Sequence, residues 1–104
     1  MPSPAEIVLY RATGPHWWLT NATFDENEGL TVCSGGHGSR EWYLKIGREH
    51  VAALARALQG PQAAPEAGVL ELMQQRFGGG AENPFEAIKQ FLLDRQIPFD
   101  DSVW

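Results

Sequence analysis

Cysteine and histidine are the residue types that most often form a nucleophile and its base, and Cys33 and His37 lie four positions apart. A cysteine reacts as its thiolate, so the imidazole would have to activate the thiol. Both residues belong to or border the glycine-rich stretch Gly35–Ser39, whose glycines suit a loop between strands. A cysteine and a histidine at this spacing in a loop are a common coincidence. We therefore expect no catalysis here.

The same residue types do not predict a metal or cofactor site. His16, His37 and His50 are scattered, and no cysteine or second histidine stands at zinc-ligand spacing from any of them. The Gly-Gly-His-Gly run could in principle offer backbone N–H groups to a phosphate. However, it precedes a predicted strand instead of a helix, and it lacks the lysine and hydroxyl residue of a phosphate loop. We expect neither a metal nor a cofactor.

Carboxylates form two groups, Asp25, Glu26 and Glu28 on a predicted hairpin tip and Asp100 and Asp101 near the C-terminus. Solvated positions like these do not raise a carboxyl pKa into the range that acid–base catalysis needs. Two interpretations stand side by side: ordinary solvated charge, or an acidic surface that contacts a basic protein partner. Electrostatic attraction would speed association in the second case.

Aromatic side chains could supply binding energy beside these charges, because Trp and Tyr dominate many interfaces. Trp17 lies in a strand with large apolar residues on both faces, and Tyr43 lies on the outward-facing set of its strand. Trp104 could either contact a partner or fill the core and fix the C-terminus. The predicted partner-binding residues are Trp17, Asp25, Glu26, Glu28, Tyr43, Asp100, Asp101 and Trp104.

The elements that position these residues centre on Glu41–Leu58, where a strand leads directly into a helix. Trp42, Leu44 and Ile46 alternate with polar residues, the two-residue period of a strand with one buried face. After Gly47, apolar residues recur at helical spacing. They are Val51, Leu54, Ala55 and Leu58.

Four short strands are predicted in the first half of the chain: Glu6–Ala12, His16–Phe24, Leu30–Ser34 and Arg40–Ile46. Their short connections favour antiparallel neighbours, and Gly29 suits the bulged turn after Asp25. In the second strand, the odd-numbered and the even-numbered residues both include large apolar and polar side chains, so neither set is entirely apolar. That strand is therefore either covered on both sides, which general burial of Trp favours, or carries an exposed aromatic residue.

Helices follow over Pro65–Phe77 and from Pro84 to about Arg95. Asn83 is predicted as the N-cap of the last helix, with Glu86 reaching back to it. Ile97–Trp104 is predicted to be extended, because Pro98 disfavours helix at Ile97, and to lie on the sheet edge or across the helices. Residues 1–4 are a predicted disordered lead-in.

Length and composition complete the fold class. A chain of 104 residues suits one domain, here α+β: a four-stranded antiparallel meander, three helices packed on one face, and an extended tail at 97–104. The formal net charge of −5 and the absence of a Lys/Arg cluster argue against nucleic-acid binding and an anionic membrane surface. One cysteine and no visible signal peptide or apolar span favour the cytoplasm.

The chain combines three features: the short-stranded meander, the strand that passes into a helix ending in Arg56-Ala57-Leu58, and the closing segment from Phe85 to Trp104. In these features the chain resembles small bacterial immunity proteins, the antitoxin partners of polymorphic or contact-dependent growth-inhibition toxins. The resemblance covers Arg40–Leu58 and Pro84–Trp104. Its clearest pattern is the spacing of Phe85, Phe91, Leu92, Ile97, Pro98 and Phe99. The resemblance implies an acidic cytosolic inhibitor without an active site, which covers the active site of a cognate toxin domain.

Three function hypotheses follow. The first is an immunity protein that neutralises a toxin domain with a basic contact surface, and is not an enzyme. The second is a non-catalytic adaptor, or a chaperone for a secreted effector, whose partner would lack toxicity. The third is a small enzyme that uses Cys33 and His37, for which rapid labelling of Cys33 at neutral pH would be expected.

Overall fold

The architecture is α+β, a five-stranded antiparallel sheet with three helices. The structure is a computed structural model and describes residues 5–36, 38–59, 68–80 and 82–103. The predicted lead-in at 1–4, the start of the second helix at Pro65, His37 and Trp104 lie outside the described residues.

The first four strands form a meander in which each strand pairs with the next. They are β1 (Ala5–Ala12), β2 (Trp18–Asp25), β3 (Gly29–Gly36) and β4 (Trp42–Ile46). The three helices α1 (Arg48–Leu58), α2 (Val69–Phe77) and α3 (Phe85–Asp94) follow β4. Strand β5 (Asp100–Val103) then pairs with β4.

The C-terminal segment is thus a fifth strand, where the sequence predicts an extended tail beside four strands. Of the two predicted placements, the sheet edge is the one observed: Tyr43 pairs with Ser102 and Lys45 with Asp100. The short polar sequence of β5 has no strand pattern of its own. Its conformation depends on main-chain pairing with β4, which comes from a distant part of the chain.

The glycine-rich stretch is also placed differently from the prediction, because Gly35 and Gly36 belong to β3 and not to a loop. A Cβ atom at Gly36 would lie 2.4 Å from Cε3 of Trp18. Glycine is therefore needed here because an indole lies against the strand. Gly29 does serve the predicted turn: its φ is 102°, and a Cβ would lie 2.2 Å from the Ile46 carbonyl oxygen.

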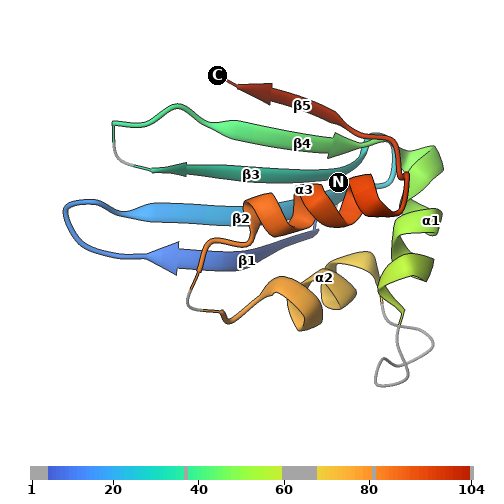
Figure 1. Cartoon of the computed structure of the whole chain (residues 1–104), viewed down its shortest axis with the longest axis horizontal. Coiled ribbons are helices and arrows are strands. Elements are labelled where there is room, and N and C mark those ends of the chain that lie inside the picture. Colours follow the sequence, from blue (N-terminus) through green and yellow to red (C-terminus); the bar gives the residue numbers. More distant parts are fainter. Residues whose placement is uncertain (1–4, 37, 60–67, 81, 104) are drawn as a thin grey trace.

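The core lies between the helices and one face of the sheet. Figure 1 shows α3 in front of the sheet and running roughly along the strands, with α2 beside it and α1 at one end of the sheet. Along β3 and β4 most side chains that face the helices are buried, whereas the alternate side chains of Thr31, Cys33, Tyr43 and Lys45 are half-buried or exposed. The buried members are Leu30, Val32, Ser34, Leu44 and Ile46. The favoured prediction that β2 is covered on both faces is wrong: Trp18 faces inward, while Trp17 precedes the strand and is 46% exposed.

A hydrogen-bonded ring joins the start of α3 to the sheet. The Asn83 amide donates to Ser34 Oγ at 3.1 Å, and Thr20 Oγ1 donates to Asn83 Oδ1 at 2.8 Å. The two hydroxyls are 2.8 Å apart, and Trp18 Nε1 also donates to Ser34 Oγ at 2.8 Å. The Phe85 N–H donates to Asn83 Oδ1 at 3.1 Å, so Asn83 does hold the first turn. The helix itself begins at Phe85, one residue later than predicted, so the prediction of Asn83 as N-cap is wrong and Pro84 takes that position without a side-chain cap.

Candidate protein-contact site

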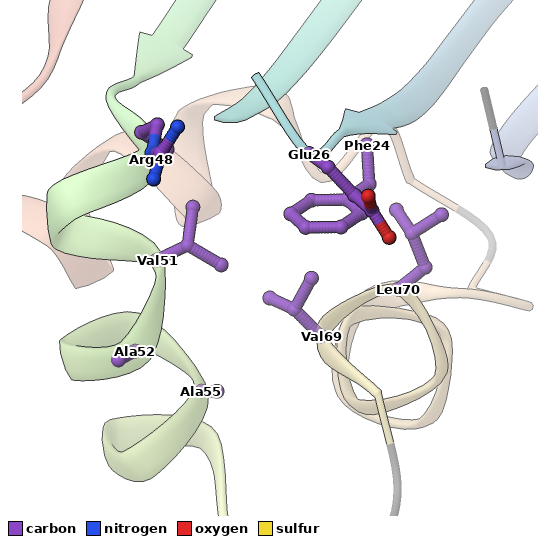
Figure 2. A pocket seen from close by; sticks show the side chains of 8 residues that line it. All are labelled: Phe24, Glu26, Arg48, Val51, Ala52, Ala55, Val69 and Leu70. Atoms are coloured by element: carbon purple, nitrogen blue, oxygen red, sulfur yellow. The ribbon is translucent and has the colours of Figure 1, made fainter. Parts of the chain in front are cut away.

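An apolar pocket of about 490 Å³ opens between α1, the start of α2 and the end of β2. Figure 2 shows Phe24, Val51 and Val69 pointing toward one another across this space. The other lining residues are Glu26, Arg48, Ala52, Ala55 and Leu70. The volume lies in the range of ordinary ligand pockets, but the walls carry few polar groups.

Small side chains on α1 create the pocket. Val51, Ala52 and Ala55 face it from one side of the helix, and two alanines leave room that larger residues would fill. The prediction assigns Val51 and Ala55 to the core stripe, and both are half-buried. The sequence gives no signal for the opposite wall, because Val69 and Leu70 read as ordinary core residues of α2.

Two opposite charges stand at the mouth of the pocket, Glu26 from the β2–β3 turn and Arg48 from the first turn of α1 (Figure 2). They do not form an ion pair with each other. The two ion pairs within the described residues are Lys89–Asp101 and the weak contact of His50 with Glu49. Both rim charges are exposed and therefore accessible to a partner.

The predicted acidic hairpin lies beside this pocket, but its three carboxylates differ in role. Asp25 Oδ1 accepts hydrogen bonds from the N–H groups of Asn27 and Glu28, at 2.7 and 3.2 Å. Asp25 therefore shapes the turn, as aspartate does in many turns. Glu26 and Glu28 are exposed, and they are the carboxylates that can meet a partner.

The two aspartates of β5 each lie near a lysine. Asp100 is the register partner of Lys45, and Asp101 lies 2.9 Å from Lys89 Nζ on α3. The hydrogen bond and charge of Lys89 hold the pKa of Asp101 below its ordinary value. The tail is therefore a weaker candidate for binding a basic partner than the hairpin.

Of the predicted aromatic residues, Tyr43 lies beside the tail because it pairs with Ser102 of β5, but neither Tyr43 nor Trp17 lies at the acidic hairpin. The pairing of Ala12 with Trp18 places Trp17 at the opposite end of the sheet from the β2–β3 turn. Tyr43 is half-buried on the outward set of β4, where it donates a hydrogen bond to Glu41 that raises the pKa of the phenol. The predicted surface is thus divided among three places, and Trp104 lies outside the described residues.

Cys33 lies on the outward set of β3 and pairs in register with Tyr43. Burial raises the pKa of its thiol, and the nearby Glu41 charge adds to this, whereas the Tyr43 hydrogen bond opposes it. This environment disfavours the thiolate that a nucleophile needs. Within the described part of the chain, no three His, Cys, Asp or Glu side chains come together as a metal site.

No protein-family model, curated protein or solved structure matches this chain. Over the residues that the structure describes, the helices are all too short or too polar to cross a bilayer.

Proposed function

We propose that this protein is a non-catalytic inhibitor that binds a basic surface of a partner protein, as an immunity protein binds its toxin domain. The observation that carries the proposal is the apolar pocket with Glu26 at its mouth and Glu28 nearby on the same turn. An apolar depression with charge at its edge resembles the anchor pockets of protein interfaces. A partner side chain would fill the pocket, and basic neighbours would meet the turn.

The chemistry around the pocket supports binding in preference to catalysis. Its ionisable lining residues are Glu26 and Arg48, and neither has a nucleophile beside it. Cys33 lies on the outward face of the sheet with a raised thiol pKa. We therefore propose that the protein transforms no substrate and acts in the cytoplasm, where its toxin would be active.

The direct test is co-expression with a toxin domain encoded beside this chain. We expect restored growth and a 1:1 complex on size-exclusion chromatography. A 1:1 complex with a partner that is not toxic would indicate the adaptor or chaperone hypothesis. Absence of both growth rescue and complex would contradict the proposal.

The contact site can be tested with a matched pair of substitutions on α1. Ala52 and Ala53 are adjacent and exposed, but only Ala52 lines the pocket. We expect Ala52→Trp to fill the pocket and weaken binding about tenfold or more, as loss of an anchor contact does, while Ala53→Trp leaves binding unchanged. Equal effects of the two substitutions would place the interface elsewhere.

The electrostatic part needs a second pair. Glu26→Lys with Glu28→Lys should slow association and reduce its dependence on salt, because exposed charges act mainly on the on-rate. Asp25 is left intact because it forms the turn. Asp100→Lys is the comparison, since Asp100 already lies opposite Lys45 and should matter less. A larger effect of Asp100→Lys would move the contact to β5.

A further inference from the structure

A second cavity, of about 280 Å³, lies between the start of α3 and the ends of β2, β3 and β4. It shares no lining residue with the apolar pocket. Its walls combine aromatic rings with a carboxylate and polar groups. They are Trp18, Ser34, Trp42, Asn83, Phe85 and Glu86.

The aromatic walls are held in place by contacts around them. Trp18 and Trp42 stack with ring centroids 5.9 Å apart and an interplanar angle of 29°. The hydrogen bond from Trp18 Nε1 to Ser34 fixes the first indole, and Gly36 gives it room on the neighbouring strand. Rings fixed before binding lose little freedom when a ligand arrives.

Glu86 supplies the charge of the cavity. Lys89, one turn further along α3, pairs with Asp101 at 2.9 Å. Glu86 acts on Lys89 through its charge but belongs to neither ion pair of the described residues. Glu86 lies in the first turn of α3. By contrast, Ser34 and Asn83 are already hydrogen-bonded within the ring. The cavity therefore offers a ligand three aromatic rings and one carboxylate.

We propose that this cavity binds an organic cation, a quaternary ammonium or guanidinium group. Such a cation is attracted to aromatic rings and needs few hydrogen bonds from its site, while a carboxylate balances its charge. The volume is slightly below that of ordinary drug-sized pockets, about 300–1,000 Å³, and suits a small head group. The inference is independent of the proposed inhibitor function.

The test is a titration of the full chain followed by NMR of the indole N–H groups and by Trp fluorescence. The probes are choline, N-acetyl-arginine amide and the neutral tert-butyl analogue of choline. We expect saturable shifts at Trp18 and Trp42 with a cation and none with the neutral analogue. Binding of choline alone points to a small quaternary ammonium ligand. Binding of the arginine derivative alone points to a side chain of another protein. Equal binding of the neutral analogue, or no saturable shift, would overturn the proposal.

Variants separate the cation site from a general effect on folding. Glu86→Gln should weaken cation binding about two- to fivefold, the range for an exposed charge pair. Glu82→Gln, an exposed position nearby that does not line the cavity, should leave binding unchanged. Trp42→Leu should weaken binding about fivefold or more. Full binding by folded Glu86→Gln would contradict the role of the carboxylate.

Discussion

The protons in the ring of Thr20, Ser34 and Asn83 have one consistent arrangement. Thr20 uses its single hydroxyl proton on Asn83 Oδ1, so Ser34 must donate the bond between the two hydroxyls. The Ser34 oxygen then accepts from Trp18 and from the Asn83 amide. One buried serine thus satisfies donors from Trp18 of β2 and from Asn83, two residues before α3.

Removing this serine oxygen should be costly. Ser34→Ala leaves the Trp18 and Asn83 donors without their acceptor, and we expect a loss of about 1–3 kcal/mol in the free energy of unfolding. Urea denaturation followed by circular dichroism measures the change. The control is Ser39→Ala, whose hydroxyl bonds to the Arg40 carbonyl in an exposed loop. Equal stability of the two variants would show that the ring contributes little.

Cys33 offers a prediction about pH. Because its thiol pKa is raised in the folded protein, the thiolate fraction at neutral pH is below that of an ordinary cysteine. Labelling of Cys33 by iodoacetamide should therefore be slower in the folded protein than in urea. In the folded protein, the labelling rate should increase only as the pH passes the ordinary thiol pKa. Tyr43→Phe should slow labelling further, since the Tyr43 hydrogen bond lowers the Cys33 pKa. Faster labelling of the folded protein at neutral pH would revive the enzyme hypothesis.

At the scale of elements, the sequence predicts best where burial follows a regular pattern. The strand-to-helix passage from Trp42 through Leu58 is confirmed, with Leu44, Ile46 and Leu54 all buried. Strand β5 is different, because its pairing is set by the edge of β4. The predicted N-cap is wrong by one residue, because Pro84 occupies that position, although Asn83 Oδ1 still accepts a hydrogen bond from the first N–H of α3. The ring that Asn83 joins depends on two strands distant in sequence.

Substitution of two leucines, one on α1 and one on α3, tests which faces of these helices are buried. Leu54 on α1 is 1% exposed and Leu93 on α3 is 53% exposed. Leu54→Ala should lower the free energy of unfolding by about 2–5 kcal/mol, because a buried leucine leaves a cavity. Leu93→Ala should change it by less than about 0.5 kcal/mol. Denaturant titration of both variants measures this, and a costly Leu93→Ala would show that α3 has a second buried face.

At the scale of the whole molecule, the arrangement of a sheet and a layer of helices explains which site residues could be predicted from the sequence. The alternation of residue types along β4 correctly predicts that Tyr43 lies on the face of the sheet that points away from the helices. It does not show that the acidic turn and Trp17 lie at opposite ends of the sheet, because that depends on strand register. The apolar pocket and the second cavity both form between elements. Their walls come from residues that the sequence pattern places in the core or gives no role.

The outer face of the sheet, which none of the three described helices covers, gives a test of this two-layer arrangement. Val8 is 38% exposed, whereas its neighbour Leu9 is 2% exposed. Val8→Thr should change the free energy of unfolding by less than about 0.5 kcal/mol. Leu9→Thr should cost about 2 kcal/mol or more, since it loses apolar burial and places a hydroxyl in the core. Thermal and urea unfolding compare the two. A costly Val8→Thr would indicate that the outer face is covered in solution.

The order of strands in the sheet also has a consequence for folding. Strands β1 to β4 can pair as successive hairpins, whereas β4 and β5 are separated in sequence by all three helices. An intermediate that lacks β5 would present unpaired main-chain groups along β4, and such edges recruit other strands. Shortening the chain before Asp100 should therefore promote self-association before it causes unfolding.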